Sequence, residues 1–439
     1  MIPTETKVIN KKIGVFSIWA IGVGMVISGE SFGWNLGWAI TGPNWFYLPV
    51  FVAAIMYFGL VQSLIELACV YPNVKGPHEY VEFAFGKNAG AFIVLAVLFE
   101  FLFATPAIAS SLGEYLGFLI GDLSLAPWIA TLFLVAFSVI NLFEVHIGVR
   151  FLTILTLMAI AELFLYQGAV ISSFKLENFA SNAFGNMSFE SFIQSIPYAI
   201  WLFLAIEGIS LMTPDIQKNN FRKKIGLGYN LAFFTLFILA VLVLTLAAGG
   251  IDWSNPASLS ILEENHPMPA SMALILGKGH ILVQIFTFIG LFGLLASLQG
   301  IALAATTQLE PLMPQFSARF ASKRVLASGL VLFISLLAVW SSGTGFLIEL
   351  SVFGAVCMYF AVSISLIKLR RKADTSIRQT LAEGTYAHVS FNSYFSSANA
   401  WLAAFISLIC VLAFVYLQFT SFLIFVACSL VYVFVIQKK

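Results

Sequence analysis

The chain has 439 residues, of which 60% are hydrophobic and only 10% are charged, and its formal net charge is +1. Average soluble domains carry about 25% charged residues, so this composition excludes a soluble globular protein and predicts an all-α polytopic membrane protein. The four cysteines have neither disulfide nor metal-site spacing. Because no catalytic constellation, phosphate loop or basic nucleic-acid patch is visible, we expect no enzyme, cofactor, structural metal or nucleic-acid partner.

Apolar segments near or above the roughly 20 residues that cross a bilayer follow one another along the chain. Twelve are predicted, at residues 13–40, 44–71, 88–121, 126–143, 151–174, 191–214, 225–251, 279–304, 325–340, 344–367, 398–418 and 419–437. An even number places both termini on the same side of the membrane.

The basic residues indicate which side that is. Of the 22 lysines and arginines, all but Lys175 and Lys278 fall at the termini or in loops on one side of the predicted segments. Cytoplasmic loops carry an excess of Lys and Arg. We therefore predict cytoplasmic N- and C-termini in a multi-pass protein of the plasma membrane, which in a bacterium is the inner membrane.

Glycine interrupts the first and sixth segments beside an acidic residue. Glu30 follows Gly29, and Glu207 precedes Gly208. A carboxylate at the bilayer centre costs about 2.5–3.5 kcal/mol on insertion scales, and no lysine or arginine lies inside any apolar segment. In an inverted repeat of five helices the first and sixth correspond, and broken helices at matching places mark a transporter's central site. The missing positive charge is expected to be a proton, a metal cation or a cationic substrate.

Other residues near the two breaks are candidates for substrate contact. Around the first break, Ser28 and Gly29 would offer a hydroxyl and free backbone groups, although the glycines are also typical of a packing stripe and Ser28 could bond back to its own turn. Before the second break come Trp201, Phe203 and Ala205. An aromatic ring there can hold a cation over its face, although rings in apolar helices more often face lipid or core.

The remaining acids differ in their depth within the predicted segments. Glu100 and Glu162 lie nearer the middle of their segments and are interpreted as carriers of a coupled proton or as protonated packing residues. Ser297 could supply a hydroxyl to a sodium ion or simply pack. The acids nearer segment ends, Glu66, Glu114 and Glu349, are interpreted as solvated or snorkelling. All five histidines fall in loops or at segment ends and are interpreted as ordinary polar residues.

Five stretches carry a family resemblance: Val26–Trp34, Ile65–Gly86, Ile196–Gly208, Ile289–Gly300, and Leu350–Tyr359 with Leu369–Lys372. In them the chain resembles the amino acid–polyamine–organocation (APC) permeases, and within these the ethanolamine permease-like branch. The resemblance implies a LeuT-like fold in one transmembrane domain over 1–439. Its inverted repeats would cover about 13–174 and about 191–367, with additional helices at about 398–437.

The resemblance also implies alternating access to a midplane site. Trp201 matches the gating aromatic, Ser28, Gly29 and Glu207 match substrate-contacting positions, and Thr105 is a weaker match. Met212–Asp215 and Thr306–Thr307 depart from the usual inner-gate residues. The fifth helix lacks the lysine that mimics a sodium ion in many proton-driven relatives, and it offers Glu162 instead. The coupling ion, proton or sodium, is therefore left open.

These observations predict a secondary active transporter of a small amine such as ethanolamine. In amino acid permeases of this fold, the substrate carboxylate meets N–H groups at the broken first helix, a site that attracts anions. Here the chain has its own carboxylate, Glu30, at that place, which would repel a full amino acid and accept an amino alcohol. Two alternatives stay open: a permease for neutral or cationic amino acids, and a non-transporting solute sensor of the same fold.

Overall fold

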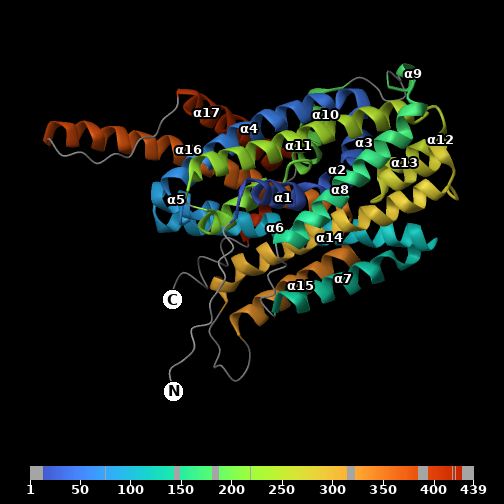
Figure 1. The fold of residues 1–439 in the computed structure, drawn as a ribbon, viewed down its shortest axis with the longest axis horizontal. Coiled ribbons are helices and arrows are strands. Elements are labelled where there is room, and N and C mark those ends of the chain that lie inside the picture. The colour runs from blue at the N-terminus through green and yellow to red at the C-terminus, as the bar shows by residue number, and fades with distance from the viewer. Residues whose placement is uncertain are drawn as a thin grey trace.

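The computed structural model describes residues 13–74, 76–142, 149–179, 187–217, 219–313, 322–383, 394–417, 419–420 and 422–427. Throughout these ranges the regular structure is helical, apart from one isolated parallel bridge between Ile13 and Ile216. The predicted all-α fold is confirmed. The long helices lie side by side in a bundle, and short helices cover its ends (Figure 1).

The long apolar helices are α4 (Tyr47–Val70), α6 (Lys87–Ile120), α7 (Ala126–Leu142), α8 (Val149–Val170), α11 (Phe221–Gly250), α14 (Ile281–Leu309), α15 (Lys323–Ser341), α16 (Thr344–Glu383) and α17 (Tyr394–Leu417). The shorter elements are α5 (Pro77–Phe85), η1 (Leu123–Leu125), η2 (Ile171–Ser173), α9 (Leu176–Phe179), α12 (Pro256–Leu259), η4 (Ser260–Glu263), α13 (Pro267–Leu276) and η5 (Glu310–Leu312). The broken first and sixth spans are described below.

Among the described residues, ten helical segments are long and apolar enough to cross a membrane, and a bent pair at the start of the chain makes an eleventh. These segments agree with the first eleven predicted ones. Of the twelfth, 419–437, the structure describes residues 419–420 and 422–427, and the remainder lies outside the described residues. The outer helices expose side chains such as Trp128, Leu132 and Phe405, each more than 60% accessible, which suits a lipid solvent rather than water.

The first span is broken as predicted. Helix α1 (Val15–Val26) ends before Ile27, one turn of helix forms α2 (Ser28–Ser31), and α3 (Trp34–Trp45) continues at an angle of 65°. Gly33 adopts φ +97°, a left-handed conformation that glycine reaches without the strain that a Cβ would introduce. This glycine is where the chain changes direction.

The sixth span is broken a few residues earlier than Glu207 and Gly208 indicated. Helix α10 (Phe189–Trp201) ends at Trp201, residues 202–205 form turns, and a 3₁₀ segment η3 (Ile206–Asp215) follows. Ala205 has φ +79°, an unusual conformation for a residue with a side chain. Glu207 therefore lies in the first turn after the break rather than at the break itself.

Helices α6 and α16 approach each other closely. A Cβ on Gly354 of α16 would lie 2.5 Å from the Ala96 carbonyl oxygen and 2.9 Å from the Glu100 amide nitrogen. The Ser351 hydroxyl donates to the Glu100 carbonyl oxygen at 2.7 Å. Only a glycine at 354 allows this spacing, which brings α16 against the part of α6 that carries Glu100.

Candidate functional site

Glu30 is fully buried inside the first break, with 0% of its surface exposed. Neither of its carboxyl oxygens has a hydrogen-bond partner. The backbone around it is better satisfied, because the Trp34 indole donates to the Glu30 carbonyl oxygen at 3.0 Å and the Tyr115 hydroxyl donates to the Ser31 carbonyl oxygen at 3.1 Å. The break is thus held by aromatic donors, and only the carboxyl group is left without a partner.

The two broken spans pack directly against each other. A Cβ on Gly29 would lie 2.6 Å from the Trp201 carbonyl oxygen, and one on Gly33 would lie 2.6 Å from the Trp201 ring. The Trp201 indole donates to the Phe32 carbonyl oxygen at 3.2 Å, and the two rings meet edge to face at 5.4 Å. The glycines at 29 and 33 therefore serve close helix packing, and Trp201 lies across the first break.

Glu207 and Glu100 form a second acidic group, and both side chains are fully buried. Their carboxyl groups lie within hydrogen-bonding reach of each other. The Tyr359 hydroxyl lies 3.2 Å from Glu207 Oε2. If both acids were ionised, two carboxylates that can only accept would face each other with no hydrogen between them. A bound proton removes that conflict.

Two tyrosines extend this group to the sixth span. The hydroxyls of Tyr359 and Tyr57 lie 2.8 Å apart, and the Tyr57 hydroxyl lies 3.3 Å from the Ile200 carbonyl oxygen. The series Glu100, Glu207, Tyr359, Tyr57 and Ile200 contains four contacts, but its two hydroxyls supply only two hydrogens. All four contacts are hydrogen bonds at the same time only when both acids carry a proton. The protonation of the pair therefore affects whether Tyr57 donates to Tyr359 or to the Ile200 carbonyl, which also accepts from the Phe203 amide at 3.0 Å.

The other candidate substrate contacts lie in buried positions. Ser28 is 3% exposed and Ala205 is 0% exposed. The Phe203 ring packs 5.3 Å from the Tyr57 ring. The Thr105 hydroxyl donates to the Phe101 carbonyl oxygen at 2.7 Å in its own helix, so its hydrogen is already used.

Glu162 and Ser297 lie apart from the Glu100–Glu207 pair, between α8, α14 and the first span. Glu162 packs over Gly290, whose Cβ would lie only 2.4 Å from Glu162 Oε1, and this oxygen has no hydrogen-bond partner. The Ser297 hydroxyl donates to the Gly24 carbonyl oxygen at 2.9 Å. These two residues therefore define a separate polar region beside α1.

No described lysine, arginine or histidine forms an ion pair with Glu30, Glu100, Glu162 or Glu207. The described ranges also contain no group of three or more His, Cys, Asp or Glu side chains placed to hold a metal. The centre of the bundle thus carries acids that nothing in the described part of the chain neutralises.

The comparison with known proteins agrees with this architecture. The sequence pattern of the family described as amino acid permease matches residues 13–436. The chain belongs to the amino acid permease family. It is also similar to the arginine/ornithine antiporter of Pseudomonas aeruginosa, with 26% identity over 311 residues. That match covers 67% of this permease and 60% of the length of the curated relative. The family consists of membrane transporters.

At the end of the permease that we place outside, a loop is tied to α6 and to the first span. Glu114 accepts from the Asn265 amide nitrogen at 2.9 Å, from Asn265 Nδ2 at 2.7 Å and contacts His266 Nδ1 at 2.8 Å. His266 Nε2 lies 3.0 Å from Glu264 Oε2. Asn35 Nδ2 donates to the Ile261 and Glu264 carbonyl oxygens, each at 2.8 Å. We call Glu114, Glu264, Asn265 and His266 the outer clamp.

The outer clamp corrects the interpretation of two sequence positions. Glu114 is a partner of three donors rather than a solvated acid, and His266, only 2% exposed, lies between two carboxylates. Burial raises the pKa of Glu264, and the nearby His266 opposes part of that rise. No local sequence pattern marks this arrangement, because Glu114 and His266 are 152 positions apart.

At the opposite end, both broken spans are joined again. The Ile13 amide donates to the Asp215 carbonyl oxygen at 3.0 Å, and the Gln217 amide donates to the Ile13 carbonyl oxygen at 3.2 Å. Glu66, interpreted as solvated, instead pairs with Arg370, whose Nε donates to Glu66 Oε1 at 2.6 Å. Glu349 likewise has a partner, since it accepts from the Tyr198 hydroxyl at 2.9 Å.

Proposed function

We propose that this permease carries a small organic cation, with ethanolamine as the leading substrate. One observation carries the proposal: Glu30 is buried in the broken first span without a hydrogen bond or a basic partner. An isolated buried carboxylate is strongly unfavourable, so it is expected to be balanced by a bound ammonium group or by a proton. Ethanolamine supplies an ammonium group and a hydroxyl, and it brings no second negative charge.

A full amino acid fits this position less well. Two carboxylates about 4 Å apart repel each other by about 4 kcal/mol at an effective dielectric constant of 20. An amino acid bound with its carboxylate at the first break would therefore lose much of its affinity beside Glu30. In our proposal Ser28 and Gly29 meet the hydroxyl end of the amine, and Trp201, Phe203 and Ala205 line its path toward Glu207, with Thr105 at the edge.

A cationic amino acid is the second candidate. It is supported by the similarity to the arginine/ornithine antiporter, whose named substrates carry a positive side chain. Such a solute could present its side-chain cation to Glu207 or Glu30 while its own carboxylate lies farther away. The unpaired acids favour a cation in either case, so neutral amino acids rank below both candidates.

We further propose that Glu100 and Glu207 couple transport to protons. An ammonium group at Glu207 would displace a proton from the pair, which removes one hydrogen from the four contacts that run to Ile200. The Ile200 carbonyl would then lose the Tyr57 hydroxyl and keep the Phe203 amide as a donor, which would loosen the sixth span. Other ionisable side chains near this series are Tyr229 of α11 and Cys410 of α17. Glu162 and Ser297 are the alternative coupling residues, for a proton or a sodium ion.

The proposed cycle is alternating access between two inverted repeats, about 13–174 and about 191–367, with both termini in the cytoplasm. The test is uptake into proteoliposomes of radiolabelled ethanolamine, serine and arginine, under separate proton and sodium gradients. We expect ethanolamine to enter, serine to be excluded, and Glu30→Ala to weaken this discrimination. Unchanged selectivity in Glu30→Ala would refute the role of Glu30. Binding without uptake of any solute would instead support the sensor.

A further inference from the structure

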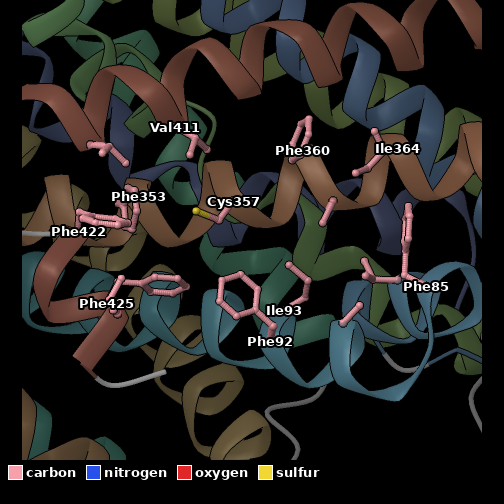
Figure 2. A pocket seen from close by; sticks show the side chains of 15 residues that line it. Phe85, Phe92, Ile93, Phe353, Cys357, Phe360, Ile364, Val411, Phe422 and Phe425 are labelled. Carbon is pink, nitrogen blue, oxygen red and sulfur yellow. The ribbon is translucent and has the colours of Figure 1, made fainter. Parts of the chain in front are cut away.

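A cavity of about 650 Å³ lies away from the acidic centre, between α5, α6, α16, α17 and residues 422–426. Its walls are apolar, and in Figure 2 rings and aliphatic side chains surround the space, with the Cys357 sulfur at one side. The volume falls within the range of about 300–1,000 Å³ typical of ligand pockets. Phe85 and Phe92 on its rim are 42% and 43% exposed, so the cavity opens to the surroundings of the bundle.

The cavity follows one face of α16. In Figure 2 its wall runs along this helix from Phe353 past Cys357 and Phe360 to Ile364. Eleven residues of helix span about 16 Å, which is about half of the roughly 30 Å hydrocarbon core of a bilayer. The cavity is thus as long as one leaflet is deep.

Lysines stand at one end of this face. Lys368 and Lys372 follow Ile364 at intervals of four residues, so they continue the same helix face. Lys368 Nζ lies 4.1 Å from the centre of the Phe85 ring, and Lys372 Nζ donates to the Ala84 carbonyl oxygen at 3.3 Å. Among the described residues neither lysine has a carboxylate in an ion pair.

The surrounding charge is positive on balance. Lys87 begins α6 two residues after Phe85 and is exposed. The described acids on this side include Glu66, which pairs with Arg370, and Glu79 and Glu82 of α5, of which Glu82 packs over Gly90. Arg371 adds a further positive charge. Basic residues next to apolar surface on the cytoplasmic side of membrane helices recognise anionic lipid headgroups, and this is the side that we assign to the cytoplasm.

We propose that the cavity binds an anionic phospholipid, with one acyl chain along α16 from Ile364 toward Phe353 and the phosphate at Lys368 and Lys372. The apolar wall suits an acyl chain, and the length of the cavity matches the depth of one leaflet. The lysines suit a headgroup with negative charge. The site is independent of the transported solute, since the acidic centre contributes no residue to it.

The test uses the full-length permease reconstituted in vesicles of phosphatidylcholine that contain a trace of a photoactivatable lipid. The probe is phosphatidylglycerol with a diazirine in its acyl chain, compared with phosphatidylcholine carrying the same chain. Cross-linked peptides are located by mass spectrometry. The variants are Lys368→Gln with Lys372→Gln, Ala361→Trp to fill the cavity, and Lys223→Gln as a matched change of charge on α11.

We expect the phosphatidylglycerol probe to label α6 and α16 around Ile93 and Cys357, well above the phosphatidylcholine probe. Each interfacial lysine contributes about a fivefold preference for an anionic lipid, so the double lysine variant should lose up to about 30-fold of this preference. Ala361→Trp should abolish labelling, and Lys223→Gln should leave it unchanged. Thermal unfolding of each variant verifies that the fold is intact.

Two results would overturn the proposal. Equal labelling by both probes, unaffected by the lysine changes, would mean that the cavity binds any acyl chain and does not distinguish the headgroups. No labelling of a folded permease would mean that lipid does not enter, as expected if the apolar residues 428–437, which follow the lining residue Val426 in the chain, occupy the space instead.

Discussion

The outer clamp and the acidic centre use the same residue type in opposite ways. In the clamp, Glu114 accepts two hydrogen bonds from Asn265 and contacts His266, which also reaches Glu264. At the centre, Glu30 has no partner at all, and Glu207 meets another acid. Buried polar groups are normally satisfied. The difference separates acids that hold the structure together from acids whose partner has to come from outside the chain.

This comparison is tested most severely by Glu30→Gln. The change keeps the shape and removes the charge, so ethanolamine uptake should fall about a hundredfold, since removing one partner of a buried charge pair costs 2–5 kcal/mol or more. Thermal stability should stay the same or rise, because no native hydrogen bond is lost and a buried charge is removed. Uptake and the unfolding midpoint are measured on the same preparation. A clear loss of stability with normal uptake would reverse the assignment of Glu30 to function.

Glu114→Ala should show the reverse pattern. It leaves the donors of Asn265 and His266 buried without an acceptor, and we expect a loss of about 3 kcal/mol, read from denaturant unfolding in detergent. Glu114→Gln keeps an acceptor oxygen, so its free energy of unfolding should lie between those of Glu114→Ala and the wild type. A substrate affinity that changes more than the stability would place Glu114 in the transport site instead.

Glu100→Gln sharpens the comparison within the centre. Glutamine can still donate to Glu207, but it does not titrate. With one proton moved per solute, a gradient of one pH unit can drive about tenfold accumulation, which corresponds to 1.4 kcal/mol, and this accumulation should be lost in the variant. Counterflow exchange without a gradient should persist, which verifies that the site still binds. Accumulation equal to that of the wild type would exclude the pair as the proton site and favour Glu162.

The smallest effect is expected at Glu264. Burial raises the pKa of this carboxyl above the ordinary value of 4.5. At a pH between 4.5 and the raised pKa, the folded state therefore binds more protons than the unfolded state. Its contribution to stability is therefore fully present below pH 4.5 and is lost as the pH rises through the raised pKa. The unfolding midpoint of the wild type relative to Glu264→Gln should be higher at pH 5 than at pH 8. If the midpoint of the wild type rose relative to that of Glu264→Gln as the pH increased, this direction would be contradicted.

The sequence predicted the individual helices better than it predicted their contacts. The break of the first span was predicted beside Gly29 and Glu30, whereas the chain changes direction at Gly33, where glycine adopts positive φ. The break of the sixth span was placed at Glu207–Gly208 but occurs at 202–205, because Ala205 takes a left-handed conformation that its residue type does not suggest. The close packing of Gly29 against Trp201 could not be predicted from local helix propensity, because it joins two spans that are far apart in the sequence.

By itself, the sequence determined that this chain is a polytopic helical membrane protein with acids in two interrupted spans, because hydropathy and the cost of a buried charge are properties of single segments. Only the tertiary structure decided which acids have partners. Tyr359 reaches Glu207 across 152 positions, and Glu114 reaches His266 across another 152. Those contacts depend on how helix faces meet in space. The same is true of the lipid-sized cavity, which exists only where α6, α16 and α17 fail to fill the space between them.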